Sequence, residues 1–328
     1  MFPGPAHTGK VLILTVTRAC DLRCSYCPTV KDGWPSLSAE QAVRAVQLFS
    51  ERGGGEIKLF GGEPLLVPQV CRAAIEAASG YDNIHRIQLS TNGRGLDEDW
   101  LRRVRGEPKL LLVISMDGRP EDHRRFRRGA ETYDHVVALL PELLATPRVV
   151  VTMVIPPATA AHAEANFLHL HGLGFRRFNF LPGYYLPWRR HQLDALEAGF
   201  DTIAGHIRRG WKQGERLYVK NLFTQAPTPF FNTGMVVDAD GTIHPSNLGL
   251  SGKLDHLREQ TRAGTLDDPP SPELLDEKAR TVHALLEQTL GEHLWASTLA
   301  VDGLLTTFCE SLYPDFLAHR RQRKIHVH

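Results

Sequence analysis

Hydrophobic residues in the first part of the chain alternate between short continuous runs and longer segments in which they recur every three to four positions. The short runs are rich in Val, Ile and Leu, and they predict strands over 11–17, 56–60, 86–91, 109–115, 148–155 and 175–181. The longer segments predict helices over 38–52, 68–79, 97–105, 133–145 and 160–172. Ser38 with Gln41 predicts a capping box on the first helix, and Asp97 predicts an N-cap on the third.

Strands that alternate with helices are joined by right-handed crossovers, so the pattern predicts a parallel sheet with the helices outside. The six repeats predict an α/β fold, a partial (β/α)6 TIM-type barrel that stays open on one side. Ligands of such barrels bind where the strands end. Four polar or glycine-rich segments lie at the ends of predicted strands: 18–28, 61–64, 90–93 and 115–118.

After Pro182 the pattern changes to a mixture of helices and short strands. It predicts a helix over 189–210, an irregular stretch over 217–229, a β-hairpin of 233–238 with 242–245, and a helix over 273–290. We therefore expect two domains, a barrel over 1–215 and a small C-terminal α+β domain over 216–328. The basic, histidine-rich segment from 319 onward predicts a disordered end, with metal binding by its histidines as a weaker alternative.

Composition adds constraints on partners and compartment. Apolar residues make up 42% and charged residues 23% of the 328, which is ordinary for a globular protein. The net charge of +1 provides no overall field for nucleic acid or an anionic membrane. The first ten residues lack a signal-peptide pattern, and no apolar run is long enough to span a bilayer. With five cysteines, these features predict a cytoplasmic protein without a membrane partner.

Three of the cysteines are crowded into one loop. Cys20, Cys24 and Cys27 follow the strand 11–17 with the spacing C-x-x-x-C-x-x-C. Three such thiolates can each bond one iron of a [4Fe-4S] cluster, which leaves the fourth iron open to a small molecule. The same spacing also suits one apolar stripe of a helix, while zinc lacks a fourth ligand nearby and disulfides would leave one thiol over.

With Tyr26 just before the last cysteine, this motif resembles the signature of the radical S-adenosylmethionine (SAM) enzymes. The resemblance covers most of residues 10–182 and implies one [4Fe-4S] cluster held by Cys20, Cys24 and Cys27, with SAM on the open iron. It implies reductive cleavage of SAM to a 5′-deoxyadenosyl radical that abstracts a substrate hydrogen. A reductant such as flavodoxin or ferredoxin is the implied partner.

The resemblance also implies which residues hold SAM. Its ammonium group would contact Gly61, Gly62 and Glu63, and its ribose would contact Ser90 and Asn92. Its carboxylate would contact Ser115 and Arg127, and its adenine would contact Tyr26 and Leu181. Arg125 or Arg128 could replace Arg127, and Pro64 suits the first turn of the next helix. From the residues alone, 61–64 equally predicts a tight turn, and so does Asn92-Gly93.

The C-terminal third resembles the SPASM domain of radical SAM enzymes that modify peptides. Residues 235–245 are similar to the hairpin that precedes its cysteines, but Ser246 stands where the family has Cys, whereas Cys309 is kept. One cysteine cannot hold a four-iron cluster, so we expect a degenerate SPASM-like domain without auxiliary clusters. Cys309 is then a core residue or, as a weak candidate, a catalytic hydrogen donor.

The substrate follows less directly. The SPASM-like tail favours a peptide or protein substrate, modified for example by crosslinking, epimerisation or rearrangement. The missing auxiliary clusters, and the absence of room for a leader-recognition domain before residue 11, favour a small-molecule metabolite. We expect a peptide, with the metabolite as the alternative. A non-catalytic iron–sulfur or zinc-binding module is the alternative of a different class.

Overall fold

The computed structural model describes residues 11–128, 131–223 and 234–325. Its centre is one ten-stranded sheet with the order β10-β9-β8-β1-β2-β3-β4-β5-β6-β7, parallel from β8 through β1 to β7. The strands are β1 (Val11–Thr17), β2 (Gly55–Gly61), β3 (Ile84–Thr91), β4 (Leu110–Ser115), β5 (Val149–Ile155), β6 (Arg177–Pro182), β7 (Tyr218–Val219), β8 (Met235–Val237), β9 (Thr242–His244) and β10 (Gly264–Thr265).

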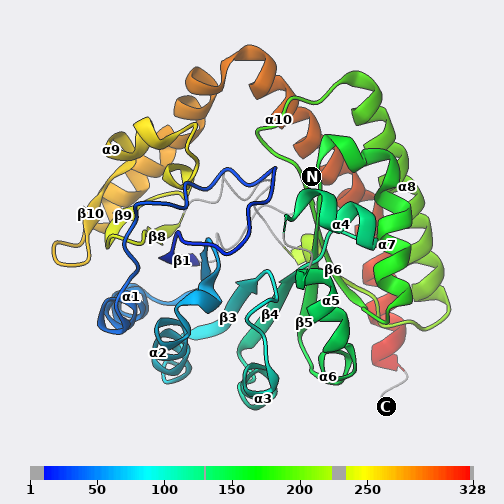
Figure 1. The fold of residues 1–328 in the computed structure, drawn as a ribbon, viewed down its shortest axis with the longest axis horizontal. Helices are drawn as coiled ribbons and strands as arrows, with labels where there is room; N and C mark the ends of the chain where they lie inside the picture. The colour runs from blue at the N-terminus through cyan, green and yellow to red at the C-terminus, as the bar shows by residue number, and fades with distance from the viewer. Residues whose placement is uncertain (1–10, 129–130, 224–233, 326–328) are drawn as a thin grey trace.

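Helices cover the outer side of the curved sheet, and Figure 1 shows the strands as an open ring inside them. The α-helices are α1 (Ala39–Glu51), α2 (Pro68–Ser79), α3 (Glu98–Gly106), α4 (Pro120–Phe126), α5 (Glu131–Ala138), α6 (Leu140–Ala145), α7 (Ala163–Gly172), α8 (Arg190–Lys212), α9 (Arg258–Thr261) and α10 (Pro272–Ile325). The short 3-10 helices are η1 (Pro64–Leu66), η2 (Pro157–His162), η3 (Lys220–Phe223), η4 (Leu248–Leu250) and η5 (Asp255–Leu257).

The partial α/β barrel predicted from the hydrophobic pattern is confirmed. All six predicted strands form, and the capping box of Ser38 with Gln41 and the N-cap at Asp97 are both present. Side chains along each strand point alternately to the outer helices and to the inside of the ring. In β2, Ile57 and Leu59 are fully buried under the helices, and their neighbours face the inside. The apolar core therefore lies between the sheet and the outer helices.

One predicted helix and the predicted disordered end are wrong. The segment 133–145 is not one helix, because α6 begins with Pro141 in its first turn and a proline there lacks the N–H that would continue α5. The basic segment from residue 319 is not a disordered end, since α10 continues to Ile325. His319 is buried, and its ring stacks on Trp211 with centroids 5.9 Å apart. Residues 326–328 lie outside the described part.

The segment after β7 extends the same sheet. The predicted hairpin forms, with β8 antiparallel to β9, and β8 also pairs with β1, so that it lies beside the first barrel strand. Its predicted first residue, Thr233, lies outside the described residues, as do 224–229 of the predicted irregular stretch. Helix α10 begins one residue earlier than predicted and passes Gly291, where a non-helical φ of 70° marks a kink.

Helix α10 crosses the side of the ring that the strands leave open. Figure 1 shows it running from the β10 end over the opening and down along α8. Phe308, in the second half of α10, is buried. Its ring centroid lies 4.8 Å from that of Phe200 in α8 and 5.4 Å from that of Phe180 in β6. Within the described residues, no helix combines the length and the apolar character that crossing a membrane requires.

Candidate active site

The cysteine loop continues β1 at the end of the strand. Cys20, Cys24 and Cys27 are half-buried thiols that form no disulfide. Leu22 is 1% exposed and anchors the loop in the core, and the Ser25 N–H donates to the Phe126 carbonyl at 2.9 Å. The three thiols are therefore held on one short loop at the carboxyl end of the barrel, as predicted.

The chemistry of these thiols fits an iron–sulfur cluster. Burial raises the pKa of Cys20 to about 11 and also raises the pKa of Cys24, so both keep their protons at neutral pH unless a cation replaces them. Among the described residues, no set of three or more Cys, His, Asp or Glu side chains is arranged around a single ion. A four-iron cluster does not need that arrangement, because each thiolate bonds a different iron.

The glycine turn after β2 packs directly on the start of this loop. The Gly62 N–H donates to the Thr17 carbonyl and the Glu63 N–H to the Ala19 carbonyl, each at 2.8 Å. A Cβ on Gly61, which has a φ of 141°, would lie 2.0 Å from the Thr17 carbonyl oxygen. Both glycines are thus needed for the approach of the two backbones, in addition to any contact with a ligand.

We expect Gly62→Ala to displace the cysteine loop. The new Cβ would lie 2.1 Å from the Ala19 carbonyl oxygen and 2.3 Å from that of Arg18, and neither backbone atom can move away alone. The free energy of unfolding should fall by about 1–3 kcal/mol, and iron bound per chain after reconstitution should fall with it. Gly106→Ala, where nothing lies within 4 Å, is the control. Equal iron content in both variants would contradict the expectation.

Glu63 is 1% exposed, and its carboxylate is occupied by the protein. It accepts hydrogen bonds from the Leu65 N–H at 2.9 Å, the Thr91 hydroxyl at 2.7 Å and the Asn92 N–H at 2.7 Å. Burial raises its pKa to about 7, although these three donors act in the opposite direction. Glu63 therefore fastens the end of β3 to the glycine turn.

A small cavity of about 70 Å³ lies where β2, β3 and β4 end. It brings together six of the residues predicted to hold SAM, which are Gly61, Gly62, Glu63, Ser90, Asn92 and Ser115. Phe60 and Thr91 also line it and were not predicted, although each adjoins a predicted residue in the sequence. Tyr26, Pro64, Arg127 and Leu181 do not line this cavity.

Asn92 connects the end of β3 to the cysteine loop. Its side-chain amide donates to the Asp21 carboxylate at 2.8 Å, and its side-chain carbonyl accepts from the Arg94 N–H at 2.8 Å. Asp21 also lies 3.6 Å from the Arg94 guanidinium. Gly93 has a φ of 89°, so the turn interpretation of Asn92-Gly93 holds as well.

The last turn of the cysteine loop is held by a buried ion pair. Asp117, two residues after the end of β4, accepts from Nε and Nη2 of Arg127 at 2.9 and 3.0 Å and from the Tyr26 hydroxyl at 2.5 Å. The Val154 N–H of β5 donates to the same carboxylate at 3.2 Å. Arg127 lies over the Tyr26 ring, 5.6 Å from its centroid. The neighbouring carboxylate holds the pKa of Arg127 above its ordinary value although burial lowers it.

This geometry adds a role for Arg127 that the sequence did not indicate. Its guanidinium is 6% exposed and neutralised by Asp117, so any hydrogen bond to a SAM carboxylate would share the group with that aspartate. In the sequence, Asp117 lies in the strand-end segment 115–118, which indicates no partner for it. Its contacts join residues 10 and 91 positions away in the chain, which no local pattern reveals.

The other predicted residues lie nearby on the fold or in the core. Pro64 opens η1 directly after the glycine turn, and Leu181 is half-buried near the end of β6. Cys309 is 8% exposed on α10, and burial raises the pKa of its thiol to about 12. Its thiol therefore stays protonated, which suits either a core residue or a hydrogen donor.

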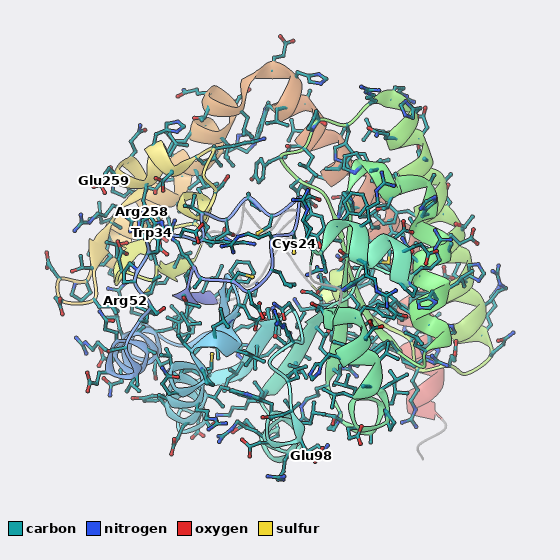
Figure 2. The ribbon with its side chains drawn as sticks, viewed as in Figure 1. Cys24, Trp34, Arg52, Glu98, Arg258 and Glu259 are labelled. Carbon is teal, nitrogen blue, oxygen red and sulfur yellow. The ribbon has the colours of Figure 1, made fainter. Side chains whose placement is uncertain are left out.

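The C-terminal segment contacts the cysteine loop from the other side. The Val30 N–H donates to the Leu250 carbonyl and the Gly252 N–H to the Pro28 carbonyl, each at 3.0 Å. Figure 2 shows Trp34 beside Arg258, while Cys24 lies near the centre of the ring. The Arg258 guanidinium lies 4.7 Å from the Trp34 ring centroid.

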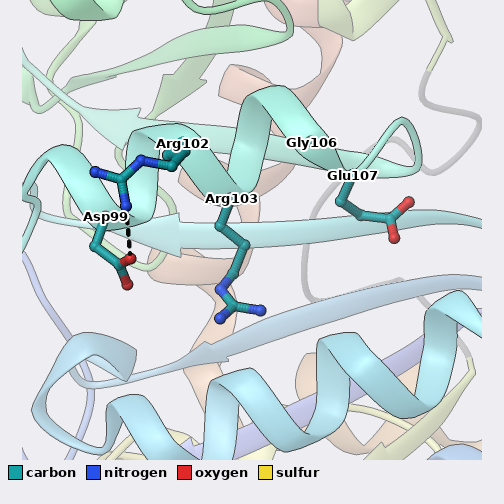
Figure 3. A pocket seen from close by; sticks show the side chains of 5 residues that line it. All are labelled: Asp99, Arg102, Arg103, Gly106 and Glu107. Carbon is teal, nitrogen blue, oxygen red and sulfur yellow. Dashed lines mark hydrogen bonds and ion pairs between the residues drawn. The ribbon is translucent and has the colours of Figure 1, made fainter.

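A larger hollow, of about 320 Å³, lies elsewhere. It is lined by Asp99, Arg102, Arg103, Gly106 and Glu107, and Figure 3 shows these side chains along α3. Helix α3 lies outside the sheet (Figure 1), and an Arg102–Asp99 ion pair of 3.3 Å crosses one edge of the hollow. None of the predicted site residues lines it, so the smaller cavity at the strand ends is the candidate site.

Comparison with known proteins bears on the family of the chain. The family description "Radical SAM superfamily" matches residues 14–167. A serine-type anaerobic sulfatase-maturating enzyme from Klebsiella pneumoniae is 26% identical over 306 residues, which cover 81% of this chain and 74% of that protein. A GTP 3′,8-cyclase from Parasynechococcus marenigrum is 32% identical over 117 residues, covering only 33% of this chain and 34% of that protein.

Solved structures agree on the fold. The structure of anSMEcpe with bound AdoMet superposes with a TM-score of 0.69 at 16% identity, covering 91% of this chain and 95% of that chain. Streptococcus suis SuiB bound to precursor peptide SuiA gives a TM-score of 0.63 at 13% identity, covering 88% and 66%.

Three free thiols on a loop at the mouth of a partial α/β barrel are suited to hold an iron–sulfur cluster. The match of residues 14–167 to the radical SAM superfamily supports a radical SAM enzyme, and the similarity to a sulfatase-maturating enzyme supports the SPASM/twitch-like type. The cofactors are accordingly S-adenosylmethionine and a [4Fe-4S] cluster.

Proposed function

We propose that this enzyme uses SAM radical chemistry to abstract a hydrogen atom from a peptide substrate and so modifies that peptide. The observation that carries the proposal is the combination of the cysteine loop with a C-terminal segment that docks on it. A serine-type anaerobic sulfatase-maturating enzyme is similar in sequence, and SuiB, which was solved with a precursor peptide, is similar in fold. The proposed modification is one such as crosslinking, epimerisation or rearrangement.

In this proposal the cluster is held by Cys20, Cys24 and Cys27, and when bound it supplies the electron for reductive cleavage of SAM. The six residues of the small cavity, Gly61, Gly62, Glu63, Ser90, Asn92 and Ser115, contact SAM. Tyr26, Leu181 and Arg127 lie around it, with Arg127 shared with Asp117. An external reductant such as flavodoxin or ferredoxin delivers the electron, and the enzyme acts in the cytoplasm.

We also propose that 216–328 is a degenerate SPASM-like domain without auxiliary clusters. The five cysteines supply three for the loop, and the remaining two, Cys71 and Cys309, are buried on separate helices. The Cys71 thiol donates to the Pro64 carbonyl at 3.2 Å, as expected for a residue of the core. The reaction then proceeds without an internal acceptor for a second electron.

The test begins with anaerobic reconstitution followed by iron counting and measurement of 5′-deoxyadenosine under a strong reductant. We expect four irons per chain and SAM cleavage, and the loss of both in Cys20→Ala, Cys24→Ala and Cys27→Ala. A bound cluster with no SAM cleavage would favour a non-catalytic iron–sulfur module. Iron retained equally in all three variants would contradict the cluster site.

The substrate is tested separately. Short peptides encoded beside the gene should raise 5′-deoxyadenosine release and change in mass or stereochemistry. Release stimulated by small metabolites and by no peptide would favour the alternative, radical chemistry on a metabolite. Cys309→Ala should retain full turnover if that thiol is a core residue, whereas loss of product with continued SAM cleavage would identify it as the hydrogen donor.

A further inference from the structure

A closed ring of three residues lies between the cysteine loop and the end of β3. Asp21 follows Cys20 directly, and its Oδ1 accepts from the Asn92 side-chain amide at 2.8 Å while its Oδ2 lies 3.6 Å from the Arg94 guanidinium. The Arg94 N–H completes the ring by donating to the Asn92 side-chain carbonyl at 2.8 Å. The ring therefore joins two distant segments of the chain beside one of the proposed cluster ligands.

The ring fixes the orientation of the Asn92 amide. A backbone N–H can only donate a hydrogen bond and a carboxylate can only accept one, so the carbonyl must face Arg94 and the amide nitrogen must face Asp21. Asn92 is 6% exposed, and its backbone N–H donates to the Glu63 carboxylate at 2.7 Å, so its main chain is held as well. Since Asn92 lines the small cavity, the second N–H of its amide is left for a ligand there.

Asp21 is placed to hold this amide and not to contact a ligand of the small cavity itself. It is not among the residues that line the cavity, and its side chain is 21% exposed. Within the described part of the chain, its carboxylate is the one hydrogen-bond acceptor of the Asn92 amide nitrogen. Without that acceptor, the orientation of the amide would depend on the Arg94 N–H alone.

We propose that Asp21 is a positioning residue that aims the Asn92 amide at the ribose of SAM. This inference rests on the proposed contact between Asn92 and SAM, and it adds a residue that acts through that contact. Because Asp21 follows Cys20, the amide is tied to the cysteine loop as well as to β3. A donor that is held in place before the ligand arrives saves the entropic cost of ordering it on binding.

The test is calorimetric titration of the anaerobically reconstituted enzyme with SAM, without reductant, on preparations of equal iron content. Asp21→Ala should weaken SAM binding by about fivefold or more, because the Asn92 amide loses its fixed orientation. Asp21→Asn should stay within about twofold of the wild type, because its side-chain carbonyl can still accept from the Asn92 amide. Asp32→Ala removes an 86% exposed carboxylate from the same loop and should bind SAM like the wild type.

A double variant tests whether Asp21 acts through Asn92. Asp21→Ala combined with Asn92→Ala should bind SAM no more weakly than Asn92→Ala alone, because no amide is left to position. A role that is only structural would add its own loss in the double variant. If Asp21→Ala does not fold, Asn92→Asp should bind more weakly than Asn92→Asp combined with Asp21→Asn, because two carboxylates face each other only in the single variant.

The outcomes separate this inference from the proposed function. A wild type that holds the cluster but binds no SAM would contradict the proposed site and the inference with it. Wild-type affinity in Asp21→Ala, weak binding by Asp21→Asn, or additive losses in the double variant would overturn the positioning role and leave the proposed function intact. In the replacement experiment, equal binding by Asn92→Asp with and without Asp21→Asn would overturn it as well.

Discussion

Asp117→Ala is expected to lower the free energy of unfolding by about 3–5 kcal/mol, the usual cost of removing one partner of a buried ion pair. The reason is that Arg127, 6% exposed, keeps its charge and loses both hydrogen bonds to the carboxylate. The Tyr26 hydroxyl and the Val154 N–H lose their acceptor in the same substitution. Chemical denaturation of the reconstituted protein, with and without SAM, measures the effect.

Two further variants separate the cost of leaving the Arg127 charge unpaired from the cost of lost packing. Asp117→Ala combined with Arg127→Met removes both ions, so this double variant should be more stable than Asp117→Ala alone. Asp117→Asn keeps an acceptor for Tyr26 and should fall between the wild type and the alanine variant. If Asp117→Ala unfolds within about 1 kcal/mol of the wild type, the ion pair does not stabilise the loop.

The barrel could be predicted because each of its strands and helices is specified by a short, continuous stretch of sequence. Each strand is a run of Val, Ile and Leu whose two faces differ in burial, and each helix has its own apolar stripe and often its own cap, as at Ser38 and Asp97. The break between α5 and α6 was missed although Pro141 is visible in the sequence. In that case the apolar periodicity of 133–145 outweighed the proline in the prediction.

The continuation of α10 beyond the predicted residue 290 to Ile325 was not predicted, for a physical reason. Its basic residues predict a solvated tail, but His319 is buried on Trp211, more than a hundred positions earlier in the chain. Only the parallel packing of α10 on α8 brings the two rings together. Tertiary contacts of this kind override local composition and leave no periodic trace.

The candidate site was predictable only in part. The family resemblance implies Gly61, Gly62, Ser90, Asn92 and Ser115, and the structure brings these five to one cavity at the strand ends. Partners within the site were not predicted, because Asn92 pairs with Asp21 across 71 positions and Tyr26 with Asp117 across 91. Such pairs depend on which strands become neighbours in the sheet, and a single sequence contains no direct record of that.

The second large effect is expected at the start of the cysteine loop, where Asp238→Ala should destabilise the protein more than Arg18→Met. Arg18 is 0% exposed, and its Nε donates to Asp238 at 3.1 Å while its Nη2 donates to the other carboxylate oxygen. Without Asp238, the nearest carboxylate to Arg18 is that of Asp255 at 4.0 Å. Without Arg18, Asp238 still has Arg258 at 3.4 Å.

In Arg18→Met, Asp238 keeps Arg258 as a second cation. In Asp238→Ala, the buried Arg18 guanidinium keeps only the distant, half-exposed carboxylate of Asp255, so this variant should lose more stability. We expect about 3–5 kcal/mol for Asp238→Ala and a smaller loss for Arg18→Met. Arg18 precedes Cys20 by two residues and stacks on Trp34 at 3.5 Å, so both variants should also bind less iron. Arg23→Ala breaks an exposed pair in the same loop and should cost under about 1 kcal/mol. If Arg18→Met is more destabilising than Asp238→Ala, Arg258 does not compensate the charge of Asp238.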